Sequence, residues 1–271
     1  MTLFGVVAPE GGLGATTIIT MLQKISIFAI VKPYNDTKDK KSQIKAMFDN
    51  IAPTYDRLNH LLSMNIDRLW RRRTVRLVAH QSPSAVLDVA TGTGDMAIAL
   101  ARKLPQARIC GIDLSPEMLK VAAAKFAEKG LDSRIELGEG DAEHLGFADD
   151  TFDAVTVAFG VRNFEDIPAG LREMHRVLRN NGLLAVLELA TPRSKTFGAL
   201  YGGYSHSVLP RIGGIVSSDA MAYEYLPASV DEFPSPERFT DMMREAGFAE
   251  CRFESLSFGI ATIFTGRKLT E

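Results

Sequence analysis

The chain has 271 residues, of which 24% are charged, and its formal net charge is −2. This balance is ordinary for a globular protein and lacks the basic excess of most nucleic-acid-binding domains, so we expect no nucleic-acid partner. The length fits one large α/β domain with additions. The two cysteines, Cys110 and Cys251, lack the spacing of a metal site, so we expect reduced thiols and no bound metal.

The first 40 residues are predicted to form a flexible N-terminal extension, and residues 41–271 the domain. Residues 18–31 are mostly apolar, but about 14 residues are too few, because roughly 20 are needed to cross a bilayer. No basic segment precedes the stretch and no small-residue cleavage site follows it, which argues against a signal peptide. A frayed extension or an early start codon is the favoured interpretation, with weak membrane contact as the alternative.

Residues 41–80 have helical patterns, and we interpret them as a helical lid over a site. The helix at 67–76 places Arg68, Arg72 and Arg76 on one stripe at i, i+4 spacing. A cationic amphipathic helix can lie on anionic lipid. A solvated helix face is the more ordinary interpretation of the same charges.

An apolar strand at 86–89 leads into a glycine-containing turn that opens a helix. Gly92 and Gly94 allow positive φ and a close backbone approach, so main-chain N–H groups can meet a ligand above the end of the strand. Asp113 follows about 20 residues later, where a carboxylate accepts hydrogen bonds from both ribose hydroxyls. The pattern predicts a nucleotide cradle, and by itself it also fits a nicotinamide dinucleotide.

Two further acidic positions help to separate these alternatives. Asp88 lies within the end of the first strand, where a dinucleotide site usually stays apolar and a methyltransferase uses an acid to order the loop and meet the amino-acid part of S-adenosylmethionine. Asp141 can accept from an adenine amino group, and Ala142 offers a backbone N–H. Three successive strand ends thus offer groups for methionine, ribose and adenine, which favours S-adenosylmethionine over a nicotinamide cofactor.

Strand and helix patterns alternate from residue 84 onward, which is typical of a parallel sheet covered on both faces. Two β segments at 250–255 and 257–267 then predict an antiparallel hairpin. This order indicates an α/β fold of the class I S-adenosylmethionine-dependent methyltransferase type, with a Rossmann-like, mostly parallel seven-stranded sheet and an antiparallel C-terminal hairpin. Residues 192–233 are predicted to be a substrate-side insertion. The other predicted strands lie near 85–89, 107–112, 133–137, 152–158 and 182–189, and the predicted helices near 95–103, 116–129 and 168–179.

Three segments, 47–59, 158–163 and 204–211, resemble the ubiquinone and menaquinone biosynthesis C-methyltransferases. The similarity runs from about residue 40 to 268 and includes parts outside the cofactor cradle. It implies methylation of a ring carbon on a polyprenylated quinol, for example demethylmenaquinol to menaquinol. The alternatives are a ubiquinone-pathway benzoquinol, another small lipid or phenolic acceptor, and a noncatalytic cofactor-binding subunit of a quinone-biosynthesis assembly.

Carried over by motif, the resemblance implies cofactor contacts at Thr93 in the turn, Asp113 at the ribose, and Asp141 with Ala142 at the adenine. Ala158 departs from the pattern, because many relatives have a serine there. A backbone group would have to replace that contact.

Ring carbons are weak nucleophiles unless a neighbouring hydroxyl ionises, so the site should help remove a quinol proton or stabilise the oxyanion. We expect Arg162, just beyond the fourth strand, to stabilise that anion. It could instead pair with Glu165 or Asp166. The remaining candidates for orienting hydroxyls, relaying a proton or contacting substrate are Tyr55, Asn59, Asn163, Tyr204 and His206.

Two of these candidates have a structural alternative: Tyr55 can pack within the lid, and His206 can be a hydrogen-bonded structural histidine. The expected location is cytoplasmic. Peripheral contact with the inner face of the cell membrane and a homodimer are further hypotheses, which suit a substrate with an isoprenoid tail.

Overall fold

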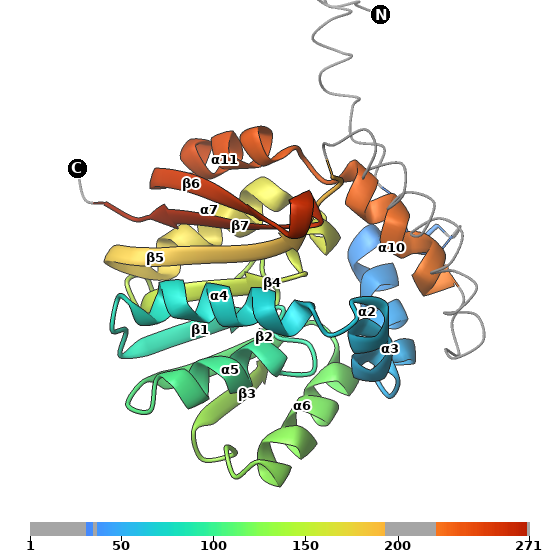
Figure 1. Cartoon of the computed structure of the whole chain (residues 1–271), viewed down its shortest axis with the longest axis horizontal. Coiled ribbons are helices and arrows are strands. Elements are labelled where there is room, and N and C mark those ends of the chain that lie inside the picture. The colour runs from blue at the N-terminus through green and yellow to red at the C-terminus, as the bar shows by residue number, and fades with distance from the viewer. Residues whose placement is uncertain (1–30, 35–36, 193–220, 270–271) are drawn as a thin grey trace, which may run out of the picture. The chain divides into compact units, whose positions relative to one another are not determined.

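The computed structural model describes residues 31–34, 37–192 and 221–269 (Figure 1). Most of the predicted extension and most of the predicted 192–233 insertion, including Tyr204 and His206, lie outside these residues. The described body begins at Val31, and its first helix, α2 (Lys40–Ile51), is capped by the Asp39 side chain, which accepts from the Ser42 backbone N–H. No helix within the described residues is long and apolar enough to cross a bilayer.

Seven strands form one sheet in the order β3-β2-β1-β4-β5-β7-β6. The first five strands pair in parallel, and β7 runs antiparallel to both β5 and β6. The predicted mostly parallel sheet with an antiparallel C-terminal hairpin is therefore confirmed. The strands are β1 (Ala85–Val89), β2 (Arg108–Asp113), β3 (Ile135–Glu139), β4 (Phe152–Ala158), β5 (Leu178–Leu189), β6 (Ala249–Leu256) and β7 (Ala261–Arg267).

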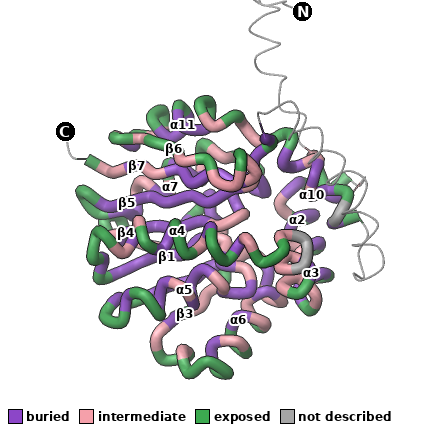
Figure 2. The backbone as a smooth tube through the Cα atoms, viewed as in Figure 1, coloured by how far each residue is buried: buried purple, intermediate pink, exposed green. Residues whose placement is uncertain are grey.

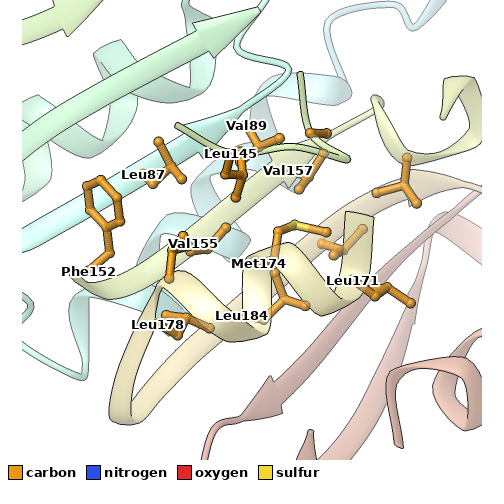
Figure 3. Packing of buried hydrophobic residues seen from close by; sticks show 14 of the residues in the cluster. Leu87, Val89, Leu145, Phe152, Val155, Val157, Leu171, Met174, Leu178 and Leu184 are labelled. Carbon is orange, nitrogen blue, oxygen red and sulfur yellow. The ribbon is translucent and has the colours of Figure 1, made fainter. Parts of the chain in front are cut away.

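Helices cover both faces of the sheet, as Figure 1 shows. Val86 packs with the helices of one face, whereas its neighbour Leu87 packs with those of the other, because successive strand side chains point to opposite faces. Figure 3 shows the second of these cores, in which Met174 lies among strand side chains such as Val155. The first layer holds α4 (Asp67–Ala79), α5 (Asp95–Lys103) and α6 (Pro116–Glu128), and the second α7 (Ile167–Val177) and α11 (Pro236–Glu245).

Burial on both faces explains the continuous apolar strands of the sequence. Every residue of β1 is buried, and Figure 2 shows the central strands as buried segments between partly exposed helices. Fully burying an aliphatic side chain stabilises a fold by about 1.5–3 kcal/mol relative to exposing it. The buried Asp88 inside β1 is thus an exception that needs hydrogen-bond partners.

A smaller third core lies among α2, α3 (Tyr55–Leu62) and α10 (Met221–Glu232), where Ile44, Leu58 and Tyr225 pack against Met118 of α6. The predicted lid at 41–80 divides accordingly. Its helices α2 and α3 belong to this third core, but α4 packs on the sheet through Trp70, Val75 and Val78. We use "lid" below for α2 and α3 only.

Two boundaries differ from the sequence expectation. β5 begins at Leu178, immediately after α7, and its pairing with β4 contains a register shift near Phe152. The break between β6 and β7 is the short 3-10 turn Ser257–Gly259, about two residues later than expected, and all three of its residues have positive φ. Such local backbone conformations leave little trace in hydrophobic periodicity, so the pattern placed the strands but not their ends.

Candidate active site

An open cavity of about 700 Å³ lies where the carboxyl ends of β1, β2 and β4 meet. This is the point at which strand order reverses, since β1 has β2 on one side and β4 on the other, and such points hold ligands in open α/β sheets. The lid covers the cavity through side chains that include Ile44 and Phe48. Of the predicted site residues, those that line it are Tyr55, Gly92, Asp113, Asp141, Ala142 and Asn163.

The two glycines of the turn have different roles. Gly92 has φ +56° and lines the cavity, and a Cβ there would meet no atom within 4 Å, so the backbone borders open space. Gly94 has φ +83°, and a Cβ there would overlap the ring of Phe126 in α6. Gly94 does not line the cavity, so the structure assigns it to packing between the turn and α6 rather than to close approach of a ligand.

Asp113 ends β2 with its carboxylate fixed over the glycine turn. Its Oδ2 accepts from the Gly92 backbone N–H at 2.8 Å, and its Oδ1 accepts from the Ser115 N–H at 2.9 Å. Burial raises the pKa of this carboxyl, while the backbone donors oppose the rise. A carboxylate has about four acceptor sites, so each oxygen retains capacity to accept from a ribose hydroxyl.

Asp88 does not line the cavity, and it orders the glycine turn through hydrogen bonds made inside the sheet. Its two oxygens accept from the hydroxyls of Thr91 and Thr156, each at 2.6 Å. Burial raises the pKa of the Asp88 carboxyl to about 6, and the two hydroxyl donors oppose that rise. Asp88 therefore ties the turn after β1 to the neighbouring strand β4.

Thr93 faces the lid and the α6 side of the turn. Its hydroxyl donates to Asp56 in α3, and the ammonium of Lys125 lies 3.4 Å from the same oxygen. Thr93 is buried but does not line the cavity. Its side chain thus connects the glycine turn to the lid.

Asp141 and Ala142 follow β3 and line the cavity. The Asp141 carboxylate pairs with Lys41 of α2 at 2.6 Å, and Lys41 also reaches Glu143 at 2.9 Å. Lys41 and Glu143 both line the cavity and were not anticipated from the sequence. In the sequence, Lys41 has the pattern of a solvent-exposed residue on an amphipathic helix. That pattern does not predict a partner about 100 residues away.

These residues fit a nucleoside that carries an amino-acid tail. The open space beside Gly92, the fixed Asp113 carboxylate and the Asp141–Ala142 pair offer acceptors and backbone donors from separate strand ends.

Arg162 lies in a short 3-10 helix, Val161–Asn163, immediately after β4. It is buried and does not line the cavity, although Gly160 and Asn163 do. Its Nη1 pairs with Glu188 at 2.7 Å and donates to the Phe159 carbonyl at 2.5 Å. The suggested pairing with Glu165 or Asp166 is not made. Among the described residues, the Arg162 Nε is one of the few buried side-chain atoms without a hydrogen-bond partner.

Lys40 supports the turn that carries Arg162. Its ammonium donates to the carbonyls of Arg162 at 3.2 Å and Phe164 at 2.8 Å. Burial lowers the pKa of Lys40 to about 8. The first residue of the lid thereby caps the turn after β4.

Two tyrosines, Tyr55 of α3 and Tyr225 of α10, lie near Arg162. Tyr55 hydrogen-bonds the Asn59 side chain one turn along α3, and burial raises its pKa while the Arg162 charge opposes the rise. Tyr225 donates to the Asn163 side chain at 3.2 Å, and burial raises its pKa to about 12. The structure thus brings Tyr55, Asn59 and Asn163 near Arg162, whereas Tyr204 and His206 fall outside the described residues.

One described group could in principle hold a metal: donor atoms of His60, Asp67 and Asp95 lie within 4.8 Å of one another. Arg71 already pairs with Asp67, and Lys125 pairs with Asp95 at 2.6 Å. A cation there would compete with two resident positive charges, so the group has the composition of an ion-pair network.

A model of the ubiE/COQ5 methyltransferase family matches residues 35–268. The chain is 50% identical over 236 residues to the demethylmenaquinone methyltransferase of Deinococcus radiodurans, which covers 87% of this chain and 97% of the relative. It is 47% identical over 231 residues to the ubiquinone/menaquinone biosynthesis C-methyltransferase UbiE of Citrifermentans bemidjiense, which covers 85% of this chain and 98% of the relative.

The fold is shared with solved methyltransferase structures. A crystal structure of an S-adenosylmethionine-dependent methyltransferase from Thermotoga maritima matches with a TM-score of 0.57 at 20% identity, covering 83% of this chain and 99% of that one. At this identity the likeness concerns the fold alone. Together with the strand order, it confirms the predicted class I architecture.

The raised pKa of Asp88 predicts a pH-dependent loss of stability. An Asp carboxyl ionises near pH 3.9 in an unfolded chain and at about 6 in the folded one, so the folded state binds this proton more tightly. The stability that results is present below pH 4 and is lost as pH rises to 6, by roughly 2–3 kcal/mol. We expect Asp88→Asn to remove this loss, measured as the free energy of unfolding by denaturant at pH 4, 5, 6 and 7.

Asp153→Asn is the matched control. The Ser84 donors and Arg179 lower the pKa of Asp153 to about 2, so its contribution is lost as pH falls from 4 toward 2 and is constant between pH 4 and 6. Unfolding free energies of wild type and Asp88→Asn that run parallel from pH 4 to 6 would contradict the assignment.

Proposed function

The chain belongs to the ubiE/COQ5 methyltransferase family and is an S-adenosylmethionine-dependent methyltransferase, and on this premise we propose that it methylates a ring carbon of a polyprenylated quinol. The proposed reaction converts demethylmenaquinol to menaquinol. Relatives that carry the name demethylmenaquinone methyltransferase and match at 43–50% identity over most of the chain support this acceptor.

Other acceptors are weaker proposals. The Citrifermentans relative is named for ubiquinone as well as menaquinone, which keeps a benzoquinol as the main alternative. Another lipid or phenolic acceptor, and a noncatalytic subunit that merely binds the cofactor, have no specific support in the site. The family assignment argues against a nicotinamide dinucleotide as the cofactor, because members of a methyltransferase family of this fold use S-adenosylmethionine as the methyl donor.

S-adenosylmethionine supplies a methyl group already activated on a sulfonium. We assign its ribose to Asp113, its adenine to Asp141 and Ala142, and the backbone approach to Gly92. Asp88 and Thr93 hold the turn through Thr156 and Asp56. The protein's remaining task is to hold the acceptor carbon in line and make it nucleophilic.

The buried Arg162 carries the acceptor half of the proposal. A phenolic hydroxyl must lose its proton before the adjacent ring carbon becomes a good nucleophile, and a buried guanidinium favours the resulting anion. The carboxylate of Glu188, which is fully buried, holds Arg162 in place because it accepts from both the guanidinium and the backbone N–H of Arg162. The Nε of Arg162 is buried and has no hydrogen-bond partner within the described residues, so one donor of the guanidinium is unsatisfied.

Tyr55 and Asn163 line the cavity beside this charge and are proposed to orient the quinol hydroxyls. Asn59 hydrogen-bonds Tyr55 and fixes its ring. Tyr204 and His206 remain proposals based on the resemblance. No step in this scheme needs a metal, and in the described part of the chain Asp67 and Asp95 are paired with Arg71 and Lys125.

We further propose a cytoplasmic enzyme that contacts the inner face of the membrane peripherally. Arg68, Arg72 and Arg76 are all exposed on α4, and Leu69 beside them is 59% exposed. The Trp70 indole donates to the Ser257 hydroxyl at 2.9 Å, which brings the exposed Phe258 next to this helix. Arginines beside exposed apolar side chains suit an anionic lipid surface. A homodimer remains a further proposal.

The test of the reaction is methyl transfer from labelled S-adenosylmethionine to chemically reduced demethylmenaquinone. We expect label on the reduced naphthoquinol and none on the unreduced quinone, because only the quinol has an ionisable hydroxyl. A demethylated benzoquinol serves as the parallel acceptor, and added EDTA is expected to leave the rate unchanged. Absence of label on every acceptor, despite tight cofactor binding, would favour another acceptor or the noncatalytic alternative.

The role of Arg162 is tested by removing the buried pair together. Arg162→Gln alone leaves Glu188 buried and unpaired, which costs about 3–5 kcal/mol of stability. The double variant Arg162→Gln/Glu188→Gln removes both charges and retains hydrogen-bonding groups. We expect it to bind cofactor normally and to lose about 10²–10³-fold in kcat.

Arg172→Gln is the control, because Arg172 lies exposed on α7 away from the cavity. It should retain the wild-type kcat. A double variant that folds and turns over at the wild-type rate would remove Arg162 from the mechanism.

Membrane contact is tested by flotation with vesicles that contain anionic phosphatidylglycerol. Replacing Arg68, Arg72 and Arg76 with Glu should abolish flotation at low salt, since each basic residue near an anionic surface contributes about 1 kcal/mol. The matched control replaces three exposed basic residues elsewhere, Arg102, Lys103 and Lys129, and should still float. No association of the wild-type protein with anionic vesicles would refute the proposal.

A further inference from the structure

Lys125 on α6 lies at the centre of a cluster of charged side chains outside the cavity. Its ammonium is 2.6 Å from the Asp56 carboxylate of α3 and 2.6 Å from the Asp95 carboxylate of α5. The Thr93 hydroxyl lies 3.4 Å away and itself donates to Asp56. The three donors of the ammonium therefore each have an acceptor, and its side chain is only 16% exposed.

The helix that Lys125 contacts is held by both apolar and polar side chains. Within residues 55–60 of α3, whose side chains are described, Leu58 is buried and the partly buried Tyr55 packs against the same third core. A helix of eight residues is too short to be stable without tertiary contacts. The polar contacts of Asp56 and His60 add to this packing and connect α3 to the glycine turn.

A second set of contacts anchors the other end of α3 to the same carboxylate. His60 lies 3.4 Å from Asp95 and 3.0 Å from Asp67, and Arg71 pairs with Asp67. Arg71 also lies over the ring of Phe159, 5.3 Å from its centroid, and Phe159 lines the cavity. The charges thus connect α3, α4 and the turns after β1 and β4.

We propose that Lys125 is a positioning residue, which latches α3 to the glycine turn by bridging Asp56 and Asp95 and so fixes the cavity wall that binds the methyl donor. Asp56 accepts from the hydroxyl of Thr93, which follows Gly92 in the turn, and Gly92 lines the cavity, so displacement of Asp56 releases that wall. Without the ammonium, the Asp56 and Asp95 carboxylates face each other as like charges, which drives α3 away from the turn.

The experiment compares Lys125→Met with Asp56→Asn, which removes the same link from the lid side, and with both together. Affinity for S-adenosylhomocysteine is measured by calorimetry, and amide hydrogen exchange is followed in residues 55–60 and 116–128. We expect each single variant to weaken binding about tenfold and to speed exchange in 55–60 but not in 116–128. Both substitutions break the same contact between Lys125 and Asp56. The double variant should therefore bind S-adenosylhomocysteine no more weakly than the single variant with the lower affinity.

Lys120→Met is the matched control, since Lys120 lies on the same helix but is 70% exposed and, among the described residues, pairs with Glu117 of its own helix. It should bind as wild type, and Lys125→Arg should restore most of the affinity. Should Lys125→Met fail to fold, Asp56→Asn carries the test. Binding within twofold of wild type for the single variants, or faster exchange spread equally through α6, would overturn the latch.

Kinetic measurements test the latch separately from the proposed quinol acceptor. Only the predicted effect of the latch on turnover rests on the proposed function. The latch predicts a larger rise in KM for S-adenosylmethionine than fall in kcat, because Asp56 and Lys125 hold Thr93 of the glycine turn, whose neighbour Gly92 lines the donor side of the cavity. If the wild type methylates no quinol, calorimetry and hydrogen exchange still decide whether Lys125 holds α3.

Discussion

The position of β1 between β2 and β4, with all three strands parallel, is the constraint on which the site depends. Parallel pairing brings the ends of these strands to one edge, so residues far apart in the chain meet there. Asp88 and Asp113 reach the same glycine turn because β1 and β2 are neighbours, and Arg162 reaches Glu188 because β4 and β5 are. The hydrophobic cores on the two faces of the sheet hold this arrangement, and Figure 3 shows one of them.

Around that edge, the protein buries charge only with partners. Asp88 accepts from two threonine hydroxyls, Arg162 pairs with Glu188, and Lys40 donates to two carbonyls. An unpaired charge would be too costly in such an environment. These contacts fix the turns after β1 and β4 before any ligand binds, so the site is largely preorganised. The lid is attached differently, through charged side chains around Lys125 and Lys41.

The contrast between the two kinds of attachment suits a site that must admit a cofactor and an apolar acceptor. The sheet and its helices are joined by two extensive apolar cores, whereas α3 is held by the smaller third core together with the ion pairs around Lys125. A firmly packed sheet edge can order the reacting groups, while a lid with a smaller core can still open. The proposed membrane contact is through α4, which packs on the sheet and is not part of the lid. Such contact would leave α2 and α3 free to move while the protein is on the membrane.

The sequence by itself determined the local structure and predicted a cofactor cradle. Alternating apolar strands and capped helices predict the sheet, and the spacing from Gly92 to Asp113 predicts the nucleotide contact, because these signals lie within short stretches of chain. Only the tertiary structure decided that Gly94 packs on Phe126, that Thr93 faces Asp56, and that α4 is not part of the lid. The pairs Lys41–Asp141, Lys125–Asp56 and Arg162–Glu188 were likewise decided there. An ion pair depends on where two side chains meet in space, and no local periodicity encodes that meeting.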